Sequence, residues 1–249
     1  MRKILGALRR AQNDFDMIAT GDKIAVGVSG GKDSLALLYA LSLYQRFAPE
    51  KFELVAVMID LGFDGVQDKI AKVREFCTSL NVELIVESTD IGKVVFEERK
   101  EKNPCSLCAK MRRGALNTVA KKIGANKLAL GHHADDVLET FLLSFIYEGR
   151  LSTMMPVTYL DRMDVTVIRP LVYADEKDVR GEAKRFEFPV FKNPCPADQH
   201  TQREYMKNLV KGICKDIPIA RDRMTQAVVS SERYNLFPKK KNQQDEVDN

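Results

Sequence analysis

Residues 23–34 read Lys-Ile-Ala-Val-Gly-Val-Ser-Gly-Gly-Lys-Asp-Ser, and this stretch decides the fold. An apolar run typical of a buried strand, residues 23–28, passes through paired glycines into a helical pattern, residues 34–46. A helix N-terminus at this point offers unsatisfied backbone N–H groups and the positive end of the helix dipole, both of which suit phosphate oxygens. Lys32 adds a positive charge, and Ser29 and Ser34 add hydroxyl donors. The stretch therefore predicts a phosphate-binding loop between a strand and a helix.

The loop is not a Walker A sequence, because Asp33 stands where Ser or Thr should follow Gly-Lys. A ligand-free glycine-rich turn would explain Gly30 and Gly31, but it gives no reason for Lys and Asp beside two serines. The hexapeptide from Ser29 to Ser34 resembles the PP-loop of ATP pyrophosphatases. Those enzymes split ATP between the α and β phosphates, adenylate a carbonyl oxygen and replace that oxygen with nitrogen or sulfur.

The composition narrows the class of protein. A chain of 249 residues with 45% hydrophobic content is long enough to bury a full core, and we expect one α/β domain with appended helices. No apolar run approaches the roughly 20 residues needed to span a bilayer, and residues 1–16 lack the apolar core of a signal peptide. We therefore expect a cytoplasmic enzyme without a membrane partner. The net charge of +4 is compatible with a polyanionic partner.

Short β-rich runs alternate with amphipathic helical runs along the chain, which is typical of a doubly wound, mostly parallel sheet. The pattern predicts about five strands, at residues 23–28, 52–59, 82–87, 127–131 and 165–169. It predicts helices at residues 34–46, 66–80, 108–123, 135–148, 176–186 and 202–215. The resemblance implies an adenine nucleotide alpha hydrolase-like fold. We expect a helical segment over 1–20, the PP-loop domain with a cysteine cluster over 21–215, a helical segment over 216–237 and a disordered tail over 238–249.

Ligands of such sheets bind at the carboxyl ends of the strands, where two further segments carry polar side chains. Asp60, at the end of the second strand, is suited to bind ribose or magnesium, and Ile59 offers backbone contacts to adenine. After the fourth strand, Gly131-His132-His133-Ala134-Asp135-Asp136 begins a helix. Its two aspartates predict magnesium binding against the β and γ phosphates, with helix capping as the alternative.

Two other side-chain types at this edge are ambiguous. Adjacent histidines usually point different ways, so we expect at most one of His132 and His133 to face the site. Arg169 follows the fifth strand. Its guanidinium is suited either to bind a phosphate or to close a structural ion pair.

The five cysteines fall into two groups. Cys77 and Cys214 lie in helical patterns and fit buried small apolar residues. Cys105-Ser106-Leu107-Cys108, on a loop that enters a helix, and Cys195, between two prolines, stand apart. They suggest an incomplete zinc site with His200 or Cys214 as fourth ligand, or an iron-sulfur cluster with one open iron. A redox disulfide and, for Cys195, a simple buried thiol are the alternatives.

The whole set of motifs resembles the tRNA 2-thiocytidine synthetase family over about residues 4–234. The resemblance is carried by the phosphate loop, the Cys105 to Cys108 motif with Lys110-Met111-Arg112-Arg113-Gly114 after it, residues 131–140, Arg169-Pro170-Leu171 and Cys195. It implies a 4Fe-4S cluster on Cys105, Cys108 and Cys195, and ATP with Mg²⁺ at Ser29, Gly30, Gly31, Lys32, Asp33 and Ser34. Ile59, Asp60, Gly131, Asp135 and Asp136 complete the expected ATP site. The expected substrate is a cytidine of the tRNA anticodon loop, at position 32.

The expected reaction is ATP-dependent thiolation. The C2 oxygen of the base attacks the α phosphate, while Lys32, the loop amides and Mg²⁺ stabilise the developing charge, and sulfur then replaces the oxygen. Asp33 is expected to position magnesium or to assist proton transfer, and Asp135 is expected to hold magnesium. Cys105 and Cys108 are expected to deliver sulfur, either through the open iron or as a persulfide. Lys110, Arg112 and Arg113 are placed to meet the RNA backbone.

The expected sulfur donor is a cysteine desulfurase or inorganic sulfide, and residues 141–147 form either core or the face of a homodimer. Three alternatives stay open at this point. They are thiolation of another tRNA base, an amidating or lysine-adding enzyme with a structural zinc, and a zinc-bearing RNA-binding or sulfur-carrier protein that keeps ATP as an ordering ligand.

Overall fold

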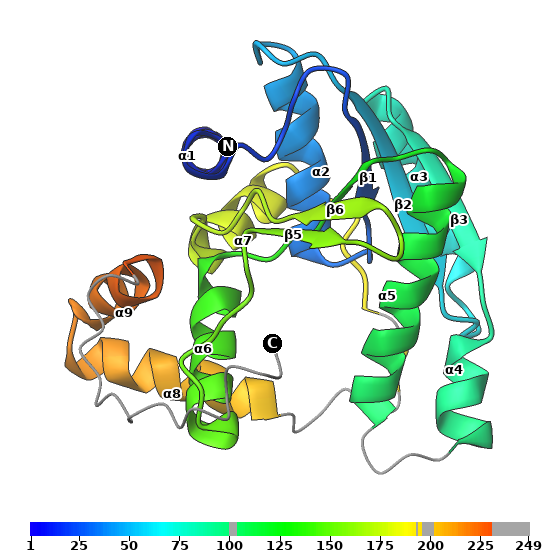
Figure 1. Ribbon diagram of the computed structural model, residues 1–249. Coiled ribbons are helices and arrows are strands. Elements are labelled where there is room, and N and C mark those ends of the chain that lie inside the picture. The colour runs from blue at the N-terminus through cyan, green and yellow to red at the C-terminus, as the bar shows by residue number, and fades with distance from the viewer. Residues whose placement is uncertain (100–103, 193, 196–201, 231–249) are drawn as a thin grey trace, which may run out of the picture.

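The computed structural model describes residues 1–99, 104–192, 194–195 and 202–230. Its centre is a six-stranded sheet in the order β3-β2-β1-β4-β6-β5 (Figure 1). The strands are β1 Lys23–Gly27, β2 Glu53–Asp60, β3 Glu83–Ser88, β4 Lys127–Ala129, β5 Val157–Leu160 and β6 Val165–Ile168. Neighbours from β3 to β6 are parallel, and β5 pairs antiparallel with β6 at the edge. The predicted mostly parallel α/β fold is confirmed.

Helices cover both faces of this sheet. They are α1 Arg2–Phe15, α2 Lys32–Gln45, α3 Gln67–Ser79, α4 Ile91–Lys93 with the π-helix η1 Val94–Glu98, α5 Pro104–Lys122, α6 Ala134–Glu148, α7 Glu176–Arg185, α8 Gln202–Asp216 and α9 Ala220–Val229. Successive strand residues point to opposite faces, so Ile24 and Val26 join the core beneath α1, α2, α3 and α7. Ala25 joins the core beneath α4, η1 and α5. Because both faces are covered, the central residues of β1 and β2 are apolar and buried.

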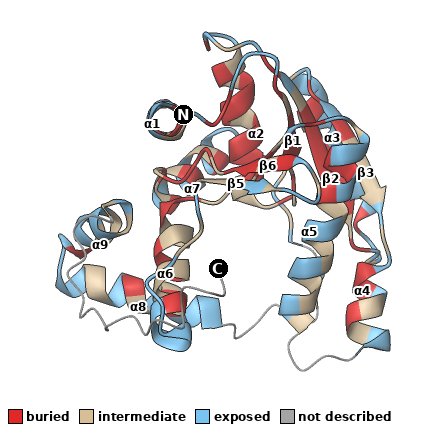
Figure 2. Cartoon of the chain, viewed as in Figure 1, coloured by how far each residue is buried: buried red, intermediate tan, exposed pale blue. Residues whose placement is uncertain are grey.

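Helix α2, which follows the phosphate loop, is deeply buried (Figure 2). Leu35, Leu37, Leu38 and Leu41 are completely buried, and they point to different sides of the helix. A helix that is apolar all round belongs in the interior of a protein. The sequence therefore anchors the N-terminus of α2, and with it the loop, in the centre of the molecule.

The structure departs from the predicted elements in three places. Residues 91–98, for which no helix is predicted, form α4 and η1. The sheet has a sixth strand, β5, whose four residues include the exposed Tyr159 and are too few to give a clear alternating pattern. Helix α5 begins at Pro104, so Cys105 and Cys108 lie inside the helix rather than on a loop that enters it. Proline favours the first position of a helix because its missing N–H needs no partner there.

The predicted terminal segments are partly described. Helix α1 lies within the predicted segment 1–20, and α9 lies within the predicted segment 216–237. The predicted tail 238–249 lies outside the described residues. Helices α8 and α9 pack against each other and against α6. Among the described residues, no helix combines the length and the apolar character needed to cross a bilayer.

Candidate active site

The loop between β1 and α2 is locked by its own serines. The Ser34 hydroxyl donates to the Gly31 carbonyl and accepts from the Ser29 N–H, both at 3.0 Å. The Ser29 hydroxyl in turn accepts from the Gly31 N–H at 3.3 Å. The N-cap residue is Gly31, which has no side chain that could cap the helix. The N–H groups in the first turn of α2 are therefore left for another acceptor. This is the arrangement that a phosphate group requires.

Two glycines allow close packing around this loop. Gly30 has a φ of +79°, and a Cβ there would lie 2.2 Å from the ring of Phe191, whose N–H donates to the Gly30 carbonyl at 2.9 Å. A Cβ on Gly131, just after β4, would lie 2.8 Å from the carbonyl oxygen of Asp33. The backbone of Gly131 therefore touches the first turn of α2, and a side chain there would separate the two segments.

Lys32 lies between two carboxylates. Its Nζ is 2.9 Å from Asp33 and 3.1 Å from Glu176 at the start of α7. Burial alone would lower the pKa of Lys32, but the two carboxylates raise it above its ordinary value, so the amine stays charged. Glu176 is itself buried, and Lys207, Lys32 and Arg180 hold the pKa of its carboxyl well below its usual range against the effect of burial.

The N-terminus of α6 faces the loop through His133. The His133 N–H donates to the Asp136 carboxylate at 2.9 Å, and the Asp136 N–H donates to His133 Nδ1 at 3.4 Å, which forms a reciprocal cap. His133 Nε2 lies 3.5 Å from Asp33. The neighbouring His132 points elsewhere and accepts from Arg169 Nε at 3.3 Å. The two histidines therefore separate, and His133 is the one at the loop.

Asp135 is bound by an arginine of α9. Arg221 donates to both of its carboxylate oxygens, at 2.5 and 2.8 Å, and the Glu176 N–H donates to it at 2.8 Å. Burial opposes ionisation, but these donors lower the pKa of Asp135. Arg221 also reaches Asp175 at 2.9 Å. Asp135 thus joins α6, α7 and α9, and its expected catalytic role stays a prediction.

A polar cavity of about 180 Å³ opens beside the loop. It is lined by Lys32, Asp33, His133, Asp136, Glu139, Glu176, Arg203, Glu204 and Lys207. Arg203 reaches Asp136 at 3.3 Å and Glu139 at 3.1 Å, while burial raises the pKa of Glu139. Magnesium usually binds through one or two carboxylates together with substrate phosphates. Asp33 and Asp136 offer that number of ligands in one cavity next to the loop.

Asp60 turns toward its own strand end. Its carboxylate accepts from the Gly62 N–H at 3.1 Å and from the Gln67 side chain at 3.4 Å, and its carbonyl accepts from Thr89. Ile59, one residue earlier, is buried. Both lie at the carboxyl end of β2, two strands from β4, and their roles toward adenine, ribose or magnesium stay predictions.

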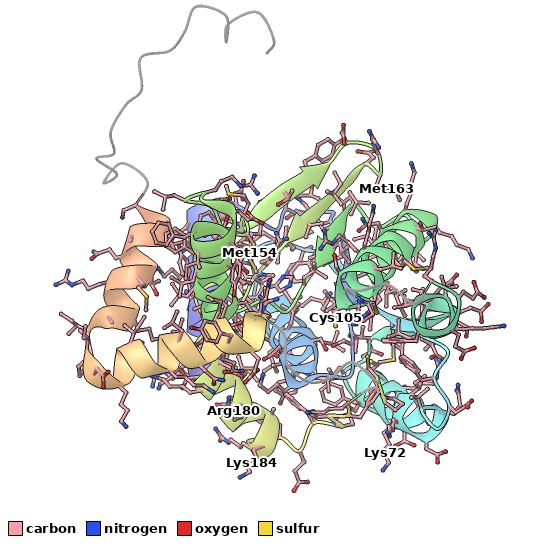
Figure 3. All side chains as sticks on the ribbon, turned by 90° about the horizontal axis from the view of Figure 1, so that it is seen from below. Lys72, Cys105, Met154, Met163, Arg180 and Lys184 are labelled. Carbon is pink, nitrogen blue, oxygen red and sulfur yellow. The ribbon has the colours of Figure 1, made fainter. Side chains whose placement is uncertain are left out.

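The predicted cluster ligands come from two distant segments. Cys105 is exposed, while Cys108 and Cys195 are half-buried, and all three are free thiols. Burial raises the pKa of Cys108, the nearby Cys195 and Cys105 act in the same direction, and Arg112 opposes them. The sulfur atoms of Cys105 and Cys195 are thus both within electrostatic range of Cys108. Figure 3 shows Cys105 near the middle of the molecule, on the first turn of α5.

The donor set fits an iron-sulfur cluster better than a closed zinc site. Soft thiolates suit both metals, but a structural zinc needs four ligands. Of the two residues expected as a fourth ligand, Cys214 is half-buried on α8, which packs against α6 and α9, and His200 lies outside the described residues. In the described part of the chain, no cluster of three His, Cys, Asp or Glu side chains is already arranged as a metal site.

Several side chains around the loop carry little sequence signal. Glu176, Arg203, Lys207 and Arg221 meet the loop or its supports from helices far along the chain. Acidic residues in a first helical turn and basic residues on a helix face are common everywhere. Only the tertiary structure shows that these side chains converge on Lys32, Asp135 and Asp136.

Comparisons with known proteins agree with this arrangement. The PP-loop domain family matches residues 4–212. The chain is 43% identical over 239 residues to a tRNA-cytidine(32) 2-sulfurtransferase of Pelobacter propionicus, covering 95% of this chain and 88% of that protein. It is 41% identical over 239 residues to the protein of the same name from Geobacter sulfurreducens, covering 94% and 92%.

A solved structure is also similar. The U34-tRNA thiolase from Methanococcus maripaludis, with its 4Fe-4S cluster, superposes with a TM-score of 0.73 at 27% identity, covering 92% of this chain and 79% of that one. The loop, the paired cysteines and the extent of these similarities point the same way. The chain belongs to the PP-loop family and, within it, to the tRNA-cytidine(32) 2-sulfurtransferases.

Proposed function

We propose that this protein uses ATP to replace the C2 oxygen of cytidine 32 in tRNA with sulfur. The observation that carries the proposal is a self-locked phosphate loop, together with three thiols close enough to interact, in a chain 43% identical to a tRNA-cytidine(32) 2-sulfurtransferase over 95% of its length. The likeness to a U34-tRNA thiolase supports tRNA thiolation in general. Cytidine 32 is the finer assignment, and tRNA as substrate supports the expected cytoplasmic location.

In the first step the C2 oxygen attacks the α phosphate of ATP and pyrophosphate leaves. Backbone N–H groups at the start of α2 and the Lys32 amine stabilise the negative charge that develops on the phosphate oxygens. We assign Asp33 and Asp136 to a magnesium ion on the departing phosphates, because both line the cavity beside the loop. The His133 N–H donates to the Asp136 carboxylate and its Nε2 lies 3.5 Å from Asp33, so His133 positions both carboxylates.

In the second step sulfur attacks C2, and AMP leaves with the former C2 oxygen. Cys105, Cys108 and Cys195 would hold a 4Fe-4S cluster, which supplies reduced sulfur close to the activated base. In this route we assign the sulfur supply to inorganic sulfide, which is already at the oxidation level of the product. The other route is a persulfide on Cys105 or Cys108, which we assign to sulfane sulfur from a cysteine desulfurase. Its outer sulfur attacks C2, the other thiol of the pair then attacks the inner sulfur to release 2-thiocytidine, and the resulting disulfide is reduced by an external thiol.

The RNA side of the proposal rests on α5. Lys110 and Arg113 are exposed and Arg112 is half-buried, and none of them forms an ion pair with a described residue. Single-stranded anticodon-loop bases are accessible to such an enzyme, and lysine and arginine bind their phosphates. A homodimer is also proposed, since Phe145 and Ile146 form an exposed apolar face on α6.

The test is an anaerobic reaction with cluster-loaded protein, ATP, Mg²⁺, sulfide and a tRNA transcript, followed by mass spectrometry of the nucleosides. We expect 2-thiocytidine together with AMP and pyrophosphate, and no product from a transcript with uridine at position 32. A thiolated uridine would instead favour another tRNA base. Pyrophosphate release without any thiolated nucleoside would contradict the proposal and favour an amidating or lysine-adding enzyme.

A further inference from the structure

Arg169 is a half-buried cation at the carboxyl end of β6 whose position the reaction steps above do not explain. Its Nε donates to His132 at 3.3 Å, and its Nη1 donates to the Met155 carbonyl at 2.5 Å and to the Thr158 hydroxyl at 3.4 Å. An arginine has five N–H donors. The two on Nη2 have no acceptor among the residues that the structure describes. One edge of the guanidinium is therefore fixed and the other is open.

No carboxylate neutralises this cation within the described ranges. Its charged neighbour is Arg113 of α5, which, together with burial, lowers the pKa of Arg169. The prediction that Arg169 closes a structural ion pair therefore has no support here. A half-buried charge beside a second like charge is costly unless an anion joins them.

His132 fixes the orientation of the Arg169 guanidinium, and with it the direction of the open Nη2 edge. Burial lowers the pKa of His132 to about 4, and Arg169 and Arg203 act in the same direction, so the imidazole is neutral. A neutral imidazole that accepts at Nδ1 fixes the guanidinium through its Nε edge. The neighbouring His133 lies against the phosphate loop. His132, which holds Arg169, is thus the sequence neighbour of the histidine that lies at the loop.

We propose that Arg169 and Arg113 together bind a backbone phosphate of the tRNA next to the base that reacts. The proposal rests on the proposed function and names two side chains that position its substrate. Arg113 lies on the same helix as Cys105 and Cys108, so this phosphate would be bound by the helix that carries two of the thiols. ATP phosphates already have the N-terminus of α2 and Lys32, and the histidine at that loop is His133, not the His132 that holds Arg169.

The test measures the salt dependence of tRNA binding by fluorescence anisotropy, with the full-length protein and a labelled transcript. In Arg169→Gln, loss of one phosphate contact should lower affinity about tenfold at moderate salt. The slope of log Kobs against log salt should become shallower by about 0.7 to 1. Arg169→Lys keeps the charge, so its slope should stay near that of the wild type. ATP affinity should be unchanged in both variants.

The matched control is Arg46→Gln. Arg46 is exposed at the far end of α2, a helix length of about 20 Å from the loop, and this variant should keep the wild-type slope and affinity. An unchanged slope in Arg169→Gln would overturn the proposal, as would a selective loss of ATP affinity, which would make the anion a nucleotide phosphate. If the wild-type protein itself fails to bind tRNA, the proposed function fails, and this outcome is separate from the other two.

Discussion

The phosphate loop and the start of α5 are built in opposite ways. In the loop, serine hydroxyls lock the backbone, and Lys32 is held by Asp33 and Glu176. On α5, Cys105 and Lys110 are exposed, and the basic side chains have no ion-pair partner in the described part of the chain. The difference teaches that the ATP half is organised by the protein itself. In the thiol half, the exposed thiol and basic side chains of α5 lack such partners among the described residues, and we assign them to an iron-sulfur cluster and to tRNA.

The largest effect should come from the thiol half. Cys195→Ala removes one of the three thiols, so we expect thiolation to fall below detection, together with a loss of iron and sulfide that elemental analysis can measure. ATP binding should be unchanged, because the loop does not depend on this segment for its charges. Cys214→Ala, in α8, is the matched control and should keep its iron and activity. Full iron content in Cys195→Ala would contradict the assigned ligands.

The next effect concerns Lys32. Lys32→Ala removes the ammonium that stabilises the developing charge, so pyrophosphate release should fall by about 10²- to 10³-fold. Iron content should stay at the wild-type value. Lys32→Ala would thus impair the ATP half and spare the thiol half, whereas Cys195→Ala would do the reverse. Lys184→Ala, an exposed lysine of α7 seen in Figure 3, is the control. Wild-type pyrophosphate release in Lys32→Ala would show that the charge at the loop is not needed.

A smaller effect is expected from Gly131, which follows β4 and packs against the phosphate loop. In Gly131→Ala the new methyl group meets the Asp33 carbonyl at 2.8 Å, so we expect a loss of about 1 to 3 kcal/mol in unfolding free energy and weaker ATP binding. Gly181→Ala on α7 has open space around it and should stabilise the helix by up to about 1 kcal/mol. Denaturant unfolding measures both. Equal stabilities for the two variants would mean that the close approach at Gly131 is not required.

The smallest effect is on the link between α9 and α6. Arg221→Gln should lower the unfolding free energy by about 1 kcal/mol at pH 7. The loss is no larger because about a quarter of the Arg221 side chain is exposed, so solvent screens its ion pair with Asp135. The pKa of Asp135 is lowered in the folded state, so the bond contributes fully above about pH 4 and is lost as the pH falls below it. The difference in unfolding free energy between wild type and variant should therefore shrink under acid. A constant difference down to pH 3 would contradict this ion pair as the cause.

The two halves also differ in how far the sequence predicts them. The loop is a local motif, so Ser29 to Ser34 predict its position between a strand and a helix without knowledge of distant residues. The contacts of Lys32 with Glu176 and of Asp135 with Arg221 join segments far apart along the chain, and no local pattern encodes them. The apolar periodicity likewise predicts the five parallel strands, while β5, with four residues and one exposed aromatic, depends on pairing with β6.

The paired state of Lys32 affects which anions the protein accepts. Without a nucleotide, the charge of the amine is neutralised by Asp33 and Glu176, and Glu176 is further tied to Lys207 and Arg180. An incoming anion must compete with these carboxylates before it can use the amine. A single orthophosphate offers few contacts in exchange, whereas a triphosphate reaches the amine, the helix amides and a metal ion together. The same competition favours release of the products, because the carboxylates recapture the lysine once the phosphate chain is cut.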